Sequence, residues 1–308
     1  MRLKLGRPDL GRYAERFDVP PAAGAWGVTF LGVASLLLDD GETRLMTDGF
    51  FSRPSLAQVA LGKIAPDPER IDAVLARVGV DRLDAVIPVH SHYDHAMDSA
   101  VVADRTGAVL VGGESTAYVG RGHGLPADRI RVATPGEPLS FGAFTLTLVE
   151  SRHCPPDRYP GEITAPVVPP VRTSAYRCGE AWSILVGHAG GATALLQGSA
   201  GFVAGSLAGR RADVAYLGVG QLGVQSEDYL RAYWSETVEA VGARHVVLTH
   251  WDDFFRPLDR DLRALPYAGD DLDVTVRVLD ELAARSGARL HFPTVWRRED
   301  PWRLLGDG

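Results

Sequence analysis

The chain has 308 residues, of which 45% are apolar and 23% charged, with a formal net charge of −7. This balance is typical of a globular protein and excludes disorder as the main state. No apolar run reaches the roughly 18 residues that a membrane-spanning helix needs, and charged residues interrupt 1–18, so we expect no secretory signal. Only two cysteines are present, which favours a reduced, cytoplasmic protein. Because the chain is acidic and lacks clustered cations, broad nucleic-acid binding is not expected.

The first part of the chain predicts antiparallel strands. Residues 1–24 form an irregular lead-in that ends in a Pro- and Gly-rich stretch, and we expect a single domain over 25–308. Three strands are predicted at 26–31, 34–38 and 44–47. Asp39-Asp40-Gly41 between the last two is typical of a hairpin turn.

Strands and helices then alternate in both halves of the chain. Asp67-Pro68 predicts a helix start, with Asp as N-cap and Pro at the first helical position, and Gly79 ends that helix. Further helices are predicted at 98–105, 226–241 and 271–285, and strands at 83–89, 108–111, 139–150 (a pair), 176–186, 192–196, 212–217 and 244–249. This order indicates two sheets packed together with helices outside.

A 22-residue connection, 154–175, contains six prolines and no regular pattern. Loops of this length in a compact domain are usually functional. We therefore expect a lid or wall over a site, with Ile163, Val167, Val168 and Val171 touching substrate or a partner subunit.

The most informative segment is His90-Ser91-His92-Tyr93-Asp94-His95, directly after the buried run 85–89. Three imidazoles and a carboxylate packed this closely would desolvate one another without a partner, and a divalent cation removes that cost. His90 and His92, two apart in an extended turn, can share one ion, while Asp94 and His95 turn toward a second position. Imidazole with carboxylate suits zinc, and also manganese or iron.

This motif resembles the His-x-His-x-Asp-His signature of the metallo-β-lactamase-fold hydrolases. Thr29-Phe30-Leu31-Gly32 and Thr47-Asp48-Gly49 look like the opening strands of that family. The nearest subgroup is the one that includes ascorbate-6-phosphate lactonase and phosphodiesterase-like proteins. The resemblance implies an α+β fold, a four-layer αβ/βα sandwich, with one or two metal ions.

The resemblance also implies two further ligands at strand ends. His153 would join His90 and His92 at the first metal, and His250 would join Asp94 and His95 at the second. The remaining histidines are interpreted as surface or core residues: His123, His188, His245 and His291.

One position departs from the family pattern. Ser199, in Gln197-Gly198-Ser199, stands where the family usually has an Asp that bridges both metals. A neutral hydroxyl is a poor metal ligand, so the second site should bind its ion more weakly.

Two residues near the motif each have two readings. Asp252 either accepts a hydrogen bond from a ligand imidazole or caps the next turn. Tyr93 either faces the substrate or packs its ring over the loop.

These features predict a metal-dependent hydrolase in which hydroxide held by the metal attacks a small-molecule ester, lactone or phosphodiester. Asp94 would orient the nucleophile. Three alternatives remain: a nucleic-acid phosphodiesterase of the same fold, a non-catalytic metal or ligand binder suggested by Ser199, and a (β/α)8-barrel metal hydrolase. No membrane partner is expected, and a homo-oligomer is compatible with the sequence.

Overall fold

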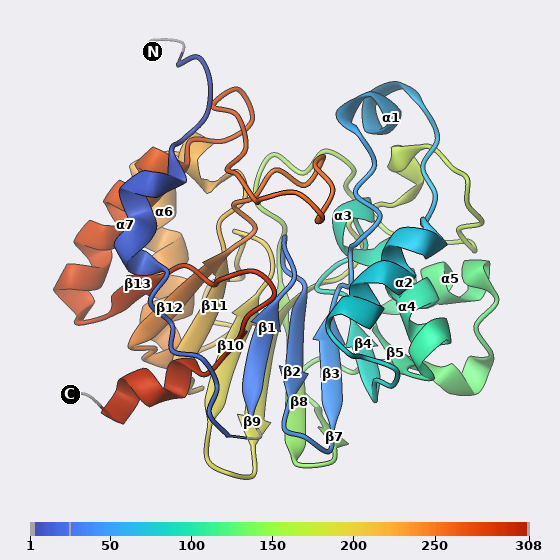
Figure 1. Ribbon diagram of the computed structural model, residues 1–308, viewed down its shortest axis with the longest axis horizontal. Helices are drawn as coiled ribbons and strands as arrows, with labels where there is room; N and C mark the ends of the chain where they lie inside the picture. The colour runs from blue at the N-terminus through green and yellow to red at the C-terminus, as the bar shows by residue number, and fades with distance from the viewer. Residues whose placement is uncertain (1–3, 25, 307–308) are drawn as a thin grey trace.

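Two seven-stranded sheets pack face to face, and helices cover their outer faces (Figure 1). The computed structural model describes residues 4–24 and 26–306, so residues 1–3 of the expected lead-in lie outside the described part. The rest of that lead-in contains a 3-10 turn, Leu10–Arg16, that the sequence did not predict. The layers confirm the αβ/βα sandwich.

The first sheet has the order β14-β1-β2-β3-β4-β5-β6. β14, β1, β2 and β3 pair antiparallel, whereas β3, β4, β5 and β6 pair parallel. The strands are β1 Gly27–Phe30, β2 Leu36–Asp39, β3 Arg44–Thr47, β4 Ala85–Ile87, β5 Val109–Gly112, β6 Ile130–Val132 and β14 Arg298–Glu299. The predicted hairpin joins β2 and β3, with Gly41 at a φ of 91°.

The second sheet repeats this arrangement, in the order β13-β12-β11-β10-β9-β8-β7. β7 to β10 pair antiparallel and β10 to β13 pair parallel. The strands are β7 Pro138–Phe141, β8 Phe144–Ser151, β9 Ala181–His188, β10 Thr193–Gln197, β11 Val214–Gly218, β12 His245–Thr249 and β13 Arg289–His291.

The helices lie on the outside of the sandwich (Figure 1). They are α1 Leu56–Leu61, α2 Pro68–Arg77, α3 Tyr93–Ala96, α4 Ser99–Thr106, α5 Glu114–His123, α6 Glu227–Trp234 and α7 Leu272–Ser286. α6 continues as a π-helical turn, Ser235–Glu239. Short 3-10 turns elsewhere in the chain are Ala127–Arg129, Thr173–Ala175, Leu222–Val224 and Pro301–Gly306. α2 starts as predicted, because the Asp67 side chain accepts from the Arg70 N–H and Pro68 occupies the first helical position.

Strand β2 shows how the layers are held together. Leu36 and Leu38 point into the core between the two sheets, and Leu37 points into the separate core under the helices. Both faces are buried over these three residues, and for that reason this part of the strand is continuously apolar and does not alternate.

The expected strand 176–186 begins five residues late, at Ala181. Cys178 and Gly179 instead donate their backbone N–H groups to the carbonyls of Tyr159 and Gly161 in the proline-rich loop. The start of the loop is thereby tied to the second sheet.

Within residues 4–24 and 26–306, every helix is too short or too polar to cross a lipid bilayer.

Candidate metal centre

The site lies where strands of both sheets end. Asp48 follows β3 directly and His90 comes shortly after β4, and these two strands are parallel neighbours. His250 follows β12, and His153 comes two residues after β8. Because neighbouring parallel strands end at the same edge of a sheet, the topology delivers these side chains to one place.

His90, His92 and His153 form one candidate metal group, with their ligand atoms all within 4.8 Å of one another. His90 Nε2 lies 3.1 Å from His92 Nδ1. His153 Nδ1 donates to the carbonyl of Cys154 at 2.6 Å, which leaves its Nε2 with a free lone pair. A fixed tautomer of this kind is what a ligand histidine requires.

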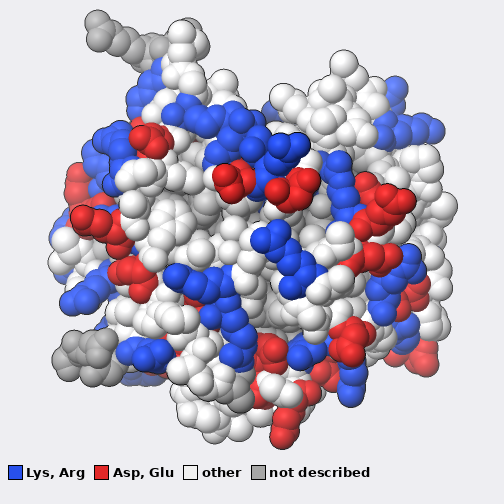
Figure 2. Space-filling view, viewed as in Figure 1, with Lys and Arg blue, Asp and Glu red and all other residues white. Residues whose placement is uncertain are grey.

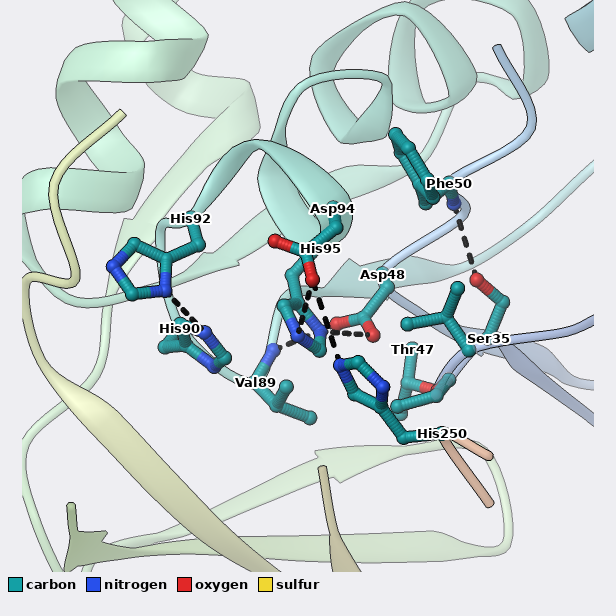
Figure 3. A network of polar contacts seen from close by, with 12 residues as sticks. Ser35, Thr47, Asp48, Phe50, Val89, His90, His92, Asp94, His95 and His250 are labelled. Carbon is teal, nitrogen blue, oxygen red and sulfur yellow. Dashed lines mark hydrogen bonds and ion pairs between the residues drawn. The ribbon is translucent and has the colours of Figure 1, made fainter. Parts of the chain in front are cut away.

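Asp94, His95 and His250 form a second group. One carboxylate oxygen of Asp94 lies 3.7 Å from His95 Nε2 and 3.5 Å from His250 Nε2 (Figure 3). His95 Nδ1 donates to Asp48 at 2.7 Å, so that its Nε2 is free to bind a metal. α3 carries both Asp94 and His95 and starts at His92, so a single turn of helix orients residues of the two groups.

The electrostatics of the metal-free site favour neutral imidazoles at His90 and His153, an ionised carboxylate at Asp94, and the protonated imidazole at His250. Burial, together with the neighbouring histidines, lowers the pKa of His90 well below its usual value. Burial and His92 lower the pKa of His153 to about 4. Burial alone would raise the pKa of Asp94, but His95 and His250 hold it below its usual range. For His250, the bond to Asp94 outweighs burial and raises the pKa.

These residues fit a divalent transition metal in each group. Imidazole nitrogens and one carboxylate are its preferred ligands. In the described part of the chain, the buried nitrogens His90 Nδ1, His95 Nε2 and His250 Nδ1 have no hydrogen-bond partner. Buried polar atoms normally have one, and a bound ion accounts for His95 Nε2, which points at the second group.

A cavity of about 620 Å³ opens over the two groups. His92, Asp94, His153 and His250 line its floor, while His90 and His95 are buried beneath. Its size is that of pockets that hold small molecules.

Tyr93, which was expected to face the substrate or to pack over the loop, and Ser199, at the position of the family's bridging Asp, also line this cavity. The Tyr93 ring packs edge-on against Phe50, so both readings of this residue hold in part. The Ser199 hydroxyl accepts from the N–H of Cys154 at 3.0 Å and so supports the backbone beside His153.

Asp252 has neither of its two predicted roles. Its carboxylate accepts from the N–H of Val33 at 2.8 Å and pairs with Arg53 at 2.7 Å, where both side chains are fully buried. Within residues 4–24 and 26–306, its carboxylate bonds neither an imidazole nor the turn that follows it. Its role is to fix the backbone after His250 against the first sheet, where His250 N donates to the Val33 carbonyl.

Two carboxylates without a predicted role, Asp48 and Asp157, contact ligand histidines. Asp48 accepts from His95 Nδ1 and from the N–H of Val89 at 2.9 Å. Asp157, in the proline-rich loop, lies 3.2 Å from His92 Nε2 and so leaves His92 Nδ1 to face His90. The position of Asp48 at the end of a strand could have revealed it, whereas no local signal marks Asp157.

The proline-rich loop forms a wall of the cavity through Arg158 and Tyr159. None of the four apolar residues expected to touch the substrate lines the cavity. Ile163 and Val167 are buried in the core under the helices, Val171 pairs with Ile64, and Val168 is exposed, so that its contact with a partner subunit stays a prediction. The later part of the loop therefore anchors it to the core through Ile163 and Val167, and the earlier, polar part, with Arg158 and Tyr159, faces the site.

The layered sheets and the two groups of potential ligands at their edge define an αβ/βα protein with a candidate metal centre. A model of the metallo-beta-lactamase superfamily matches residues 28–194, more than half of the chain, and the chain belongs to this superfamily.

One curated relative is a UPF0173 metal-dependent hydrolase of Heliobacterium modesticaldum. It is 30% identical over 120 residues, a stretch that spans 39% of this chain and only 43% of that relative.

Among solved structures, a possible metal-dependent hydrolase of Veillonella parvula is 15% identical, with a TM-score of 0.55 over 90% of this chain and 99% of that one. Igni18, a metallo hydrolase of Ignicoccus hospitalis, has a TM-score of 0.51 at 15% identity over 89% of this chain and 96% of that one. CmlA, a diiron beta-hydroxylase of Streptomyces venezuelae, has a TM-score of 0.54 at 14% identity over 90% of this chain and 54% of that one. At these identities the likeness is one of fold alone.

Proposed function

We propose that the protein is a metal-dependent hydrolase of small-molecule esters, lactones or phosphodiesters. The observation that carries this proposal is the placing of the two ligand groups, His90/His92/His153 and Asp94/His95/His250, at the floor of one cavity. Zinc is the metal that this donor set favours, with manganese and iron as alternatives. When bound, such an ion polarises the electrophile and lowers the pKa of water to about 7.

The residues of the chain divide the remaining work. Asp94 lines the cavity and is ionised, so its carboxylate can accept a hydrogen bond from the attacking water and orient it. Asp48 and Asp157 hold His95 and His92 in the tautomers that leave their ligand nitrogens free. Tyr93, whose pKa burial raises well above its ordinary value, stays protonated and can donate to a developing oxyanion.

The relative from Heliobacterium supports hydrolysis by its name, and it shares only part of its length with this chain. CmlA, which has a similar fold, is a diiron beta-hydroxylase and not a hydrolase by its name, so the fold alone does not determine the reaction. The test is a panel of nitrophenyl esters, lactones and bis-nitrophenyl phosphate, assayed with zinc- and manganese-loaded protein.

We expect turnover of at least one class, loss of it on chelation, and its return on adding metal. His90→Ala should lower kcat by more than about a hundredfold, because it removes a ligand. His123→Ala is the matched control, since His123 pairs with Asp104 away from the cavity. Metal-loaded protein that turns over none of these classes would favour the non-catalytic binder that Ser199 suggests.

The volume of the cavity, about 620 Å³, supports a small molecule as substrate, in preference to a nucleic acid. The two cysteines, Cys154 and Cys178, are free and buried, which supports a reducing compartment such as the cytoplasm.

A further inference from the structure

The walls of the cavity above the metal floor are of two kinds. One kind is apolar: Leu56, Val59 and Ala60 from α1, and Phe254, Phe255 and Leu265 from the chain after β12. Leu56 has 59% of its surface exposed although it belongs to a helix that borders the cavity. A large apolar side chain left open at the rim of a cavity favours an apolar ligand group.

The other kind of wall is cationic. Arg7, Arg158 and Arg263 line the cavity, and among the residues that the structure describes the acidic lining residues are Asp94 and Asp253. Arg7 and Arg263 share the single carboxylate of Asp253, at 3.2 and 2.9 Å. Figure 2 shows basic side chains gathered at the top of the molecule, over the loops that follow β12, where acidic side chains are fewer.

Arg158 is the least compensated of these cations. Among the residues that the structure describes, no carboxylate lies within ion-pair distance of its guanidinium. Its neighbour Asp157 is bound to His92. Arg158 lines the same cavity as Tyr93 and Asp94.

Three guanidinium groups therefore face two carboxylates, and any bound metal adds further positive charge. A neutral or cationic ligand would leave these charges unbalanced in a partly closed space. We propose that the cavity selects an anionic amphiphile: an ester, lactone or phosphodiester with an apolar chain and a separate anionic group that pairs with Arg158. This substrate class rests on the proposed hydrolase function, although the binding it requires can be measured without turnover.

The test uses zinc-loaded protein and anilinonaphthalene sulfonate, a fluorescent anionic amphiphile, as the reporter. Octanoate and octanamide, which have the same chain and differ in charge, are titrated as displacing ligands. We expect octanoate to bind about tenfold more tightly than octanamide. Arg158→Gln should weaken octanoate by about fivefold to tenfold and leave octanamide within about twofold.

Arg172→Gln is the control, because it removes the same charge from the same loop at an exposed position away from the cavity. It should leave both affinities within about twofold of the parent protein. Equal binding of octanoate and octanamide, or equal effects of Arg158→Gln and Arg172→Gln, would overturn the proposal.

The two proposals can fail separately. Charge-dependent binding through Arg158 in a protein that hydrolyses no member of the panel would support the cavity's selectivity and count against hydrolysis. Hydrolysis that is as fast for a neutral nitrophenyl ester as for its carboxylate-bearing analogue, and indifferent to Arg158→Gln, would keep the hydrolase and refute the selectivity.

Discussion

Asp48 acts on the metal centre from outside the cavity. It is fully buried, with one oxygen on His95 Nδ1 and the other on the N–H of Val89. Its backbone has a φ of 54°, an unusual conformation for a residue other than glycine. Asp48 therefore fixes the orientation and tautomer of His95, as carboxylates beside metal-ligand histidines typically do.

Asp48→Ala should lower metal affinity at the second group by about tenfold to a hundredfold, because His95 loses the partner that fixes its tautomer. It should also destabilise the fold by about 1–3 kcal/mol, since the Val89 N–H is left unpaired. Competition with a chromophoric chelator measures the affinity. Asp81→Ala, at a side chain that is 94% exposed, is the control; equal affinities in the two variants would refute the role of Asp48.

We expect Ser199 to limit how strongly a second ion is held. Ser199→Asp adds a carboxylate at the cavity wall, and we expect tighter metal binding, mainly at the Asp94/His95/His250 group, because the first group already has three imidazoles. Ser199→Asn is the matched control, since it adds the same volume without charge. Unchanged affinities in a folded Ser199→Asp protein would show that this position does not face the metals.

Single residues could be predicted from the sequence where the ligands form a compact motif. His90, His92, Asp94 and His95 stand within six positions after a strand, and the structure brings them together with His153 and His250. Asp157 could not be predicted, because its contact with His92 spans 65 positions and depends on the path of an irregular loop. Whether these residues bind metal stays a prediction.

At the scale of elements, buried strands and well-capped helices were predictable, and short exposed helices were not. α1 has a capping box between Ser55 and Gln58, but it is six residues long and buries no side chain, so no alternation of polar and apolar faces marks it in the sequence. α5 contains Gly120 and Gly122, which lower its helical propensity. Gly122 is needed there because the backbone of Val167 packs against it, a long-range contact that local patterns do not contain.

The chain that follows β12 is fixed by a buried ion pair between Asp252 and Arg53. Asp252→Ala should lower the free energy of unfolding by about 3–5 kcal/mol, because it leaves the Arg53 charge buried and unpaired. Urea denaturation measures this loss. Asp72→Ala, which breaks an exposed pair with Arg105, should cost at most about 1 kcal/mol; similar losses in both would contradict the assigned role.

For the whole molecule, the two halves follow one plan: antiparallel strands first, then parallel strands with helices outside. The alternation of strands and helices made this plan predictable from the sequence. The same alternation predicted that two sheets pack together, whereas the four-layer αβ/βα type was expected only through the family resemblance.

Metal-free protein should lose stability as pH falls from about 6.5 to about 4. The folded state holds His153 and His245 at a pKa of about 4, whereas in the unfolded chain histidine takes up a proton near pH 6.5. The unfolded state therefore binds more protons in this window, and the stability present above pH 6.5 is lost on acidification. Thermal unfolding in the presence of chelator measures the trend, and His153→Gln should reduce the slope. A slope that His153→Gln leaves unchanged would contradict the assignment.

We expect two separate metal sites, formed by His90, His92 and His153 and by Asp94, His95 and His250. Elemental analysis of protein reconstituted with zinc, after removal of excess metal, tests it most directly. We expect two ions per chain in the parent protein and in His123→Ala, with the more weakly held ion lost in His250→Ala while the fold is kept. His90→Ala should lose the more tightly held ion. Failure of the parent protein to take up zinc or manganese, or equal loss of both ions in both variants, would contradict the account.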